Sequence, residues 1–167
     1  MIVRPERADD HARIAALVEA AFESPVQARL VADLRASPGY LPELALVADD
    51  GEVVGHVMFT VTKLEDGTAI LMLSPLAVRP DRQRQGVGSA LVREGLRRAE
   101  ERREPVVIVE GDPRYYSRFG FAPASELGLE RPHERIPERA FQALSLPAYD
   151  RARTLGRVTY PPAFAGL

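Results

Sequence analysis

Apolar positions change their spacing along the chain, and the changes mark a series of helices and strands. Ile2 to Arg4 has the composition of a short strand. A stripe of apolar residues at helical spacing follows from Ile14 to Phe22, and Asp9 or Asp10 can cap that helix. A second helical stripe runs from Val26 to Leu34. The pattern therefore predicts one strand followed by two helices.

Three runs rich in apolar and β-branched residues come next, at residues 44–47, 53–62 and 69–78. Asp-Gly pairs separate them, and an Asp-Gly pair between such runs is typical of a hairpin turn. The three runs therefore predict an antiparallel meander.

The next segment alternates helix and strand. Residues 87–102 place apolar side chains among charged ones as a surface helix does, and residues 106–109 form an all-β-branched strand. Asp112 and Pro113 are typical of a helix start, so residues 114–119 are predicted to be a short helix that Gly120 ends. The strand at 69–78, the helix and the strand at 106–109 make one βαβ unit with parallel strands.

Residues 141–146 and 157–160 are predicted to be late strands. The fold class is therefore α/β, of the α+β mixed-sheet kind: a largely antiparallel sheet of six or seven strands with a central parallel βαβ unit and helices on both faces. We expect a single domain over residues 1–167 with its core at about 2–146. The extension at 147–167 either packs as an added strand or completes a dimer edge.

Composition narrows the function classes. The 167 residues are 46% apolar, which suits one globular domain, and the formal net charge of −2 offers no general attraction for nucleic acid or an anionic membrane. Cysteine is absent, so disulfides, an enzyme thiolate and the usual structural zinc sites are excluded. No run of about 18 apolar residues or signal peptide is present. We expect a cytoplasmic monomer or homodimer without a metal.

The run Gln83 to Gly88 is the strongest candidate for chemistry. Gly86 and Gly88 let the chain turn tightly and bring backbone NH groups up to an anion, and the helix that follows adds its own free NH groups. Arg82 and Arg84 can supply screening charge. A dinucleotide-binding loop is the rival reading, but Leu91 stands where that motif has its third glycine. The run is therefore predicted to bind the phosphates of a cofactor.

With these motifs the sequence resembles the GNAT-type N-acetyltransferases. Their signature Gln/Arg-x-x-Gly-x-Gly/Ala is matched by Gln83, Gly86 and Gly88. The stretch 76–80 is similar to their cofactor strand and its exit, and 116–121 to their Tyr-x-x-x-Gly-Phe element. With the Gly-Asp-Pro at 111–113, the chain is most similar to a bacterial subgroup of predicted N-acetyltransferases. The resemblance implies acetyl-CoA as the cosubstrate.

The resemblance also implies which residues bind acetyl-CoA. The NH groups of about Arg84 to Ser89 would hold its pyrophosphate, and Leu76 and Val78 would pair with the pantetheine arm as an added strand. Pro75 lacks an NH, which favours a bulge or a splay of its strand from the one at 106–109. The full set of expected cofactor-binding residues is Leu76, Ala77, Val78, Gln83, Arg84, Gln85, Gly86, Val87, Gly88, Ser89, Tyr116 and Phe119.

Acetyl transfer to an amine needs three catalytic groups. By the same resemblance the Val78 NH would stabilise the charge that grows on the thioester oxygen, and Tyr116 would protonate the leaving sulfur. For the base that deprotonates the amine, Glu110 is the leading candidate, with His56, a water chain or no dedicated base as alternatives. The acceptor site is expected near the first two helices, where Glu23, Gln27 and Arg29 stand.

Two function classes follow. The first is an acyl-CoA-dependent N-acetyltransferase that moves an acetyl group to a primary amine of a small molecule or peptide by direct attack. The second is a CoA-binding sensor or interaction module without turnover, which the absence of an obvious base motivates. A dinucleotide-binding protein is a third alternative.

Overall fold

The computed structural model describes residues 1–165 and 167 and divides into two compact units. The first unit comprises residues 1–60 and 74–98, and the second comprises 61–73 and 99–167. Two long strands, β3 (Val53–Leu64) and β4 (Ala69–Val78), have residues in both units. Each unit carries a different part of the predicted chemistry.

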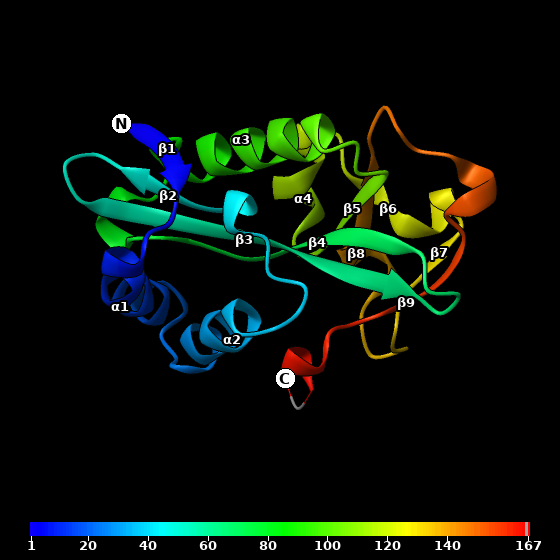
Figure 1. Cartoon of the computed structure of the whole chain (residues 1–167), viewed down its shortest axis with the longest axis horizontal. Helices are drawn as coiled ribbons and strands as arrows, with labels where there is room; N and C mark the ends of the chain where they lie inside the picture. Colours follow the sequence, from blue (N-terminus) through cyan, green and yellow to red (C-terminus); the bar gives the residue numbers. More distant parts are fainter. Residues whose placement is uncertain (166) are drawn as a thin grey trace. The chain divides into compact units, whose positions relative to one another are not determined.

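The first unit begins with the predicted strand and two helices. β1 (Ile2–Pro5) pairs with β2 (Ala45–Asp49), and β2 pairs with β3, both antiparallel as the meander predicts. The helices α1 (His11–Phe22) and α2 (Val26–Arg35) lie side by side (Figure 1). Most of each stripe is buried: Ile14, Leu17, Val18, Leu30, Val31 and Leu34. The prediction is wrong for Phe22, which is 41% exposed in the last turn of α1.

Asp10 precedes α1, but its side chain does not cap that helix. Its carboxylate accepts a hydrogen bond from the Arg7 NH at 2.8 Å and two from the Arg4 guanidinium, at 2.8 and 3.1 Å. The predicted cap is therefore replaced by a tie from Asp10 back to β1 and the turn at Ala8–Asp10. A charged guanidinium is a stronger partner for a carboxylate than a neutral backbone NH, which favours this arrangement.

Helix α3 (Val87–Glu101) packs closely against the sheet in the first unit. A Cβ at Gly55 of β3 would lie 2.8 Å from Val87 Cγ1 and 2.9 Å from Leu91 Cδ1. A Cβ at Gly95 of α3 would lie 2.1 Å from Phe59 Cε1. The two glycines therefore set how closely the start and middle of α3 approach β3.

The second unit contains the parallel pair of the predicted βαβ unit. The strand β4 runs parallel to β5 (Val106–Glu110), with Leu71 opposite Val107 and Met72 opposite Ile108. On its other side β5 pairs antiparallel with β8 (Phe141–Ser145), and β8 pairs with β6 (Ala122–Pro123). The parallel prediction is confirmed. The peptide bond Ser74–Pro75 of β4 is cis.

The structure has more strands than the sequence predicts. Among the described residues seven strands follow the order β1-β2-β3-β4-β5-β8-β6, and β7 (Leu129–Glu130) and β9 (Gly156–Thr159) pair off this path to make nine in all. Both β6 and β7 have two residues, too few for a periodic pattern to reveal. In the C-terminal extension, β9 pairs with β3 and β7, so the alternative of an added strand is confirmed.

Short helical segments connect the main elements. Helix α4 is Pro113–Tyr116, and Asp112 caps it by accepting the Arg114 NH at 2.9 Å, as predicted. The 3-10 turns are Ala8–Asp10, Pro42–Leu44, Pro80–Arg82, Ser117–Phe119, Ala124–Leu127, Glu138–Ala140, Arg151–Arg153 and Pro162–Phe164. In the part of the chain that the structure describes, no helix combines the length and apolar character that a membrane span requires.

The core of the second unit lies on one face of its strands. Val106 and Ile108 of β5 and Phe141 of β8 pack in one buried cluster. The partly buried rings of Tyr149, Tyr160, and Phe164 pack against it, together with Leu127. The C-terminal extension is therefore part of this unit's packing.

Candidate functional site

The predicted phosphate loop turns where its sequence requires it. Arg84 has φ +61° and Gly86 has φ +84°, so the chain passes twice through the left-handed region before α3. The first bond of the helix runs from the Ala90 NH to the Gly86 carbonyl oxygen at 3.0 Å. The NH groups of Val87, Gly88 and Ser89 precede that bond, so they are available to an anion at the positive end of the helix.

Side chains beside the loop brace it. The Gln83 amide donates to the Val78 carbonyl oxygen at 3.1 Å, and Arg79 reaches both Asp81 and Glu52, at 2.6 and 2.8 Å. Arg82 pairs with Asp50 at 2.9 Å. The predicted screening charge of Arg82 is therefore already compensated.

Arg84 differs from Arg82 in having no hydrogen bond or ion pair with any described residue. It is exposed and sits in the left-handed turn itself. Of the two arginines that the sequence suggests for anion binding, Arg84 is the one that keeps its charge for a ligand.

The tyrosine predicted as the acid lies in an aromatic cluster of the second unit. The Tyr116 ring meets Tyr115, Phe121 and Phe119 at centroid distances of 5.0, 5.7 and 6.3 Å. A Cβ at Gly111 would lie 2.6 Å from Tyr116 Cε2, so the ring packs directly on the backbone after β5. Burial, helped by Tyr115, raises the pKa of Tyr116 above its usual range. The hydroxyl therefore stays protonated and can donate.

Glu110 ends β5, opposite Phe141 of β8. Its Oε2 accepts a hydrogen bond from the Tyr160 hydroxyl at 3.0 Å, while Oε1 has no partner among the described residues. Burial and the neighbouring Glu110 carboxylate raise the pKa of Tyr160, so this hydroxyl also keeps its proton. Glu110 is exposed at the strand end, with one oxygen held and one open.

His56 has a different setting in the first unit. It is fully buried, and its Nε2 lies 2.8 Å from the Glu6 carboxylate. An ionised carboxylate only accepts, so Nε2 carries the proton. The same carboxylate accepts from Arg35 at 2.6 Å and from the Tyr40 hydroxyl at 3.1 Å. Burial lowers the pKa of His56, which leaves the ring neutral, and its Nδ1 has no partner in the described structure.

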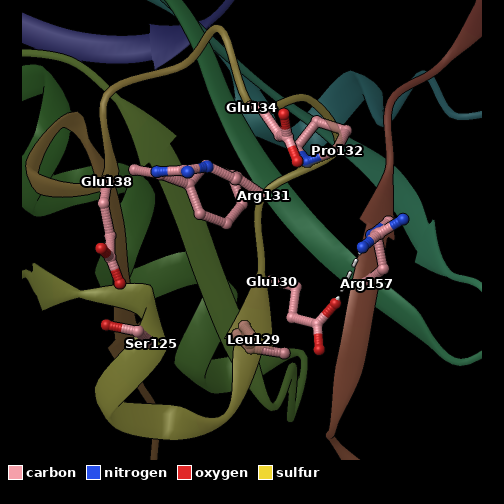
Figure 2. A pocket seen from close by; sticks show the side chains of 9 residues that line it. Ser125, Leu129, Glu130, Arg131, Pro132, Glu134, Glu138 and Arg157 are labelled. Carbon is pink, nitrogen blue, oxygen red and sulfur yellow. Dashed lines mark hydrogen bonds and ion pairs between the residues drawn. The ribbon is translucent and has the colours of Figure 1, made fainter.

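A pocket of about 340 Å³ opens in the second unit (Figure 2). Leu129 and Phe141 give it an apolar wall, and an ion pair of 3.3 Å joins Glu130 to Arg157 on another side. The remaining lining residues are Ser125, Arg131, Pro132, Glu134 and Glu138. Phe141 connects this pocket to Glu110, because the two residues stand opposite each other across β5 and β8.

Comparison with known proteins identifies the family. Residues 42–123 match the model of the acetyltransferase (GNAT) domain. The N-acetyltransferase YhbS of Escherichia coli (strain K12) is 40% identical over 132 residues, which are 77% of this chain and 78% of YhbS. A second relative, YjhQ of the same strain, is 37% identical over 71% of this chain and 67% of its own. This chain belongs to the GNAT family of N-acetyltransferases.

Solved GNAT structures extend the match to nearly the whole chain. The crystal structure of Escherichia coli YhbS in complex with CoA has a TM-score of 0.88 and 35% identity, and covers 98% of this chain and 91% of that one. A GNAT acetyltransferase of Brucella melitensis in complex with acetyl-CoA has a TM-score of 0.79 and 30% identity, covering 98% and 97%. The predicted family, fold class and type of enzyme are confirmed.

The GNAT elements divide between the two units. The first holds Val78, the loop and the start of α3, and the second holds Glu110, Tyr116 and Phe119. In the first unit the Gln83 amide binds the Val78 carbonyl oxygen, and in the second the Tyr116 ring packs against Phe119. The suggested acceptor residues Glu23, Gln27 and Arg29 lie at the end of α1 and in α2, with Glu23 in the left-handed region at φ +53°. Among the described residues no cluster of His, Asp and Glu fits a metal.

Three contacts around these GNAT elements escape the sequence reasoning. Gly55 allows α3 to approach β3, and Gly111 allows the Tyr116 ring to pack. A glycine inside a strand or just after one is the only signal for either. Tyr160 is 50 residues from Glu110, and a pairing at that distance leaves no periodic trace in one sequence.

Proposed function

We propose that this protein transfers an acetyl group from acetyl-CoA to a primary amine by direct attack. The observation that carries the proposal is the turn at Arg84 and Gly86, which frees the first NH groups of α3. A pyrophosphate needs such NH donors at the positive end of a helix. YhbS and the Brucella melitensis relative, solved with CoA and acetyl-CoA, support the same ligand for this chain.

Binding in this proposal uses main-chain groups more than side chains. The NH groups of residues 84–89 bind the pyrophosphate, and the exposed Arg84 adds charge. Leu76, Ala77 and Val78 bind the pantetheine arm along β4, with Gln83 as the brace that holds the Val78 end of the strand. Phe119 and the Tyr116 ring line the end that takes the thioester.

The chemistry needs a donor, an acid and a base. When bound, acetyl-CoA supplies an activated carbonyl and a thiol leaving group. The Val78 NH donates to the carbonyl oxygen as charge grows there, which contributes about 3 kcal/mol when such a donor is preorganised. Tyr116 gives its proton to the departing sulfur. Glu110 accepts the proton of the substrate ammonium on Oε1, so that a neutral amine attacks.

Glu110 is a better base than His56 in this proposal because of access. The His56 side chain is fully buried and its proton-bearing nitrogen is bound to Glu6, so a substrate amine would have to enter the core to reach it. Glu110 is exposed, and its open oxygen can meet an amine without any rearrangement.

A thermal melt with ligand and a thiol-release assay test the proposal. Acetyl-CoA at 100 times its dissociation constant should add about 2.7 kcal/mol to the free energy of unfolding. Thiol release with a panel of primary amines, such as spermidine, tyramine and lysine, should exceed release without amine.

Tyr116→Phe should lower kcat about 100-fold and leave the acetyl-CoA melt shift in place, because only the acid is removed. A melt unmoved by millimolar acetyl-CoA would refute cofactor binding. A normal melt shift with neither amine-dependent release nor hydrolysis of acetyl-CoA would instead indicate a CoA-binding sensor.

A further inference from the structure

Tyr160 comes from the C-terminal extension, beyond residues 42–123 that match the GNAT domain. Its hydroxyl nevertheless binds the carboxylate proposed as the base, at 3.0 Å. Within the second unit this is the contact by which the extension reaches a proposed catalytic side chain. Core packing alone does not explain this hydrogen bond, because a tyrosine ring could pack there without its hydroxyl contacting Glu110.

The backbone before Tyr160 is firmly held. Lys63 of β3 stands opposite Thr159 of β9, and the Thr159 hydroxyl donates to the Lys63 carbonyl oxygen at 2.8 Å. The Thr62 hydroxyl donates to the Thr159 carbonyl oxygen. The ring of Tyr160 then packs against Phe164 at 5.4 Å and against the buried cluster. The hydroxyl therefore presents a fixed donor and not a mobile one.

Glu110 needs such a donor because of its position in β5. Val106 and Ile108 belong to the buried cluster, and alternation along the strand puts Glu110 on the same face. The cluster ends there, so the side chain stands at its solvent edge, where a carboxylate is free to rotate. A hydrogen bond to Oε2 restricts that rotation and leaves Oε1 open.

We propose that Tyr160 is a positioning residue for acetyl transfer: it orients Glu110 so that the free Oε1 meets the acceptor's ammonium group. The acceptor nitrogen gives one proton to Oε1, and the lone pair so released forms the new N–C bond. As the C–S bond breaks, the sulfur takes the Tyr116 proton, and the second proton that the nitrogen loses on becoming an amide restores the Tyr116 hydroxyl. Tyr160 keeps its own proton throughout. This inference rests on the proposed function, in which Glu110 is the base.

A double-mutant cycle tests the role, with amine-dependent thiol release from the full chain as the readout. Tyr160→Phe keeps the ring and loses only the hydroxyl, and should lower kcat about 5- to 10-fold without changing the KM for acetyl-CoA. Glu110→Gln should lower kcat about 100-fold. In the Glu110→Gln background, Tyr160→Phe should cost less than twofold, because no base is left to orient.

Tyr149→Phe is the matched control. Tyr149 packs on the same cluster, but its buried hydroxyl has no partner in the described structure, so losing it breaks no hydrogen bond. Its kcat should stay within twofold of the parent.

Equal losses from Tyr160→Phe in both backgrounds, or a lower melting temperature with unchanged kcat, would overturn the positioning role. If the panel contains no substrate but acetyl-CoA still stabilises the protein, the same cycle is read from hydrolysis of acetyl-CoA by water, which Glu110 would deprotonate. If Tyr160→Phe lowers the hydrolysis rate equally in both backgrounds, or does not lower it at all, the inference is overturned. Failure of acetyl-CoA to bind would sink the proposed function itself.

Discussion

Two glutamates at strand ends have opposite surroundings in the two units. Glu6 follows β1 with its side chain only 1% exposed, and it binds His56, Arg35 and Tyr40. Glu110 ends β5, exposed to solvent, with Tyr160 as its donor. A buried carboxylate whose oxygens both accept hydrogen bonds holds a fold together. One with an open oxygen can take a proton from a substrate.

The Glu6 cluster joins elements that the sequence separates. His56 belongs to β3, Arg35 ends α2, and Tyr40 lies in the loop that follows. Burial by itself would raise the pKa of Glu6, but the hydrogen bonds from His56 and Arg35 outweigh it and lower the pKa to about 2. The carboxylate is therefore firmly ionised, and its role is to tie α2 to the sheet.

The largest effect should come from Glu6→Ala. This change leaves the buried His56 NH and the partly buried Arg35 cation and Tyr40 hydroxyl without their acceptor, so the free energy of unfolding should fall by about 3–5 kcal/mol. Urea unfolding measures the loss. Glu19→Ala is the control, because Glu19 is exposed on α1 and should change stability by less than about 0.5 kcal/mol. Similar losses of unfolding free energy in Glu6→Ala and Glu19→Ala would show that Glu6 does not hold the fold together.

Acid should weaken the protein through the same cluster. His56 is neutral when folded but takes a proton below about pH 6.5 when unfolded, so stability begins to fall there. Glu6 has an ordinary value of 4.5 and a folded value of about 2. Its contribution, about 3 kcal/mol, is complete above pH 4.5 and is lost as the pH falls towards 2.

Urea unfolding between pH 7 and 3 follows this loss. Glu6→Gln should flatten the part of the curve below pH 4.5, since the variant has no carboxylate to protonate there. An unchanged slope in Glu6→Gln would assign the acid sensitivity to other groups.

The smallest effect on stability, with a large one on activity, is expected from Glu110→Gln. Loss of the proposed base should lower kcat by about 100-fold, equivalent to about 2.7 kcal/mol in the activation free energy. The free energy of unfolding should change by less than about 0.5 kcal/mol, because the side chain is exposed. Measuring the thermal melt and kcat on one preparation separates the effect on stability from the effect on activity. A stability loss as large as that of Glu6→Ala would make Glu110 a structural residue.

Much of the fold follows from local pattern. The stripes of α1, α2 and α3 bury most of the residues that predicted them, because a helix's own period is enough to choose its buried face, but Phe22 at the end of α1 is exposed. The β-branched runs of β3 and β5 are buried almost throughout. The two-residue strands β6 and β7 escaped prediction, since their pairing depends on partners and not on their own period. Asp10 likewise binds Arg4 of β1 instead of capping α1.

For the site, the sequence by itself determined the turn and the candidate chemistry. Glycine at 86, the amphipathic helix behind it and Asp112-Pro113 before α4 act within a few residues, so their geometry is local. Only the tertiary structure decided that both oxygens of Glu6 accept hydrogen bonds and that one oxygen of Glu110 stays open. Glu6 meets His56 across 50 residues, and Tyr160 meets Glu110 across 50 as well. Burial and hydrogen bonding between distant segments set those roles, and a single sequence carries no record of which segments will meet.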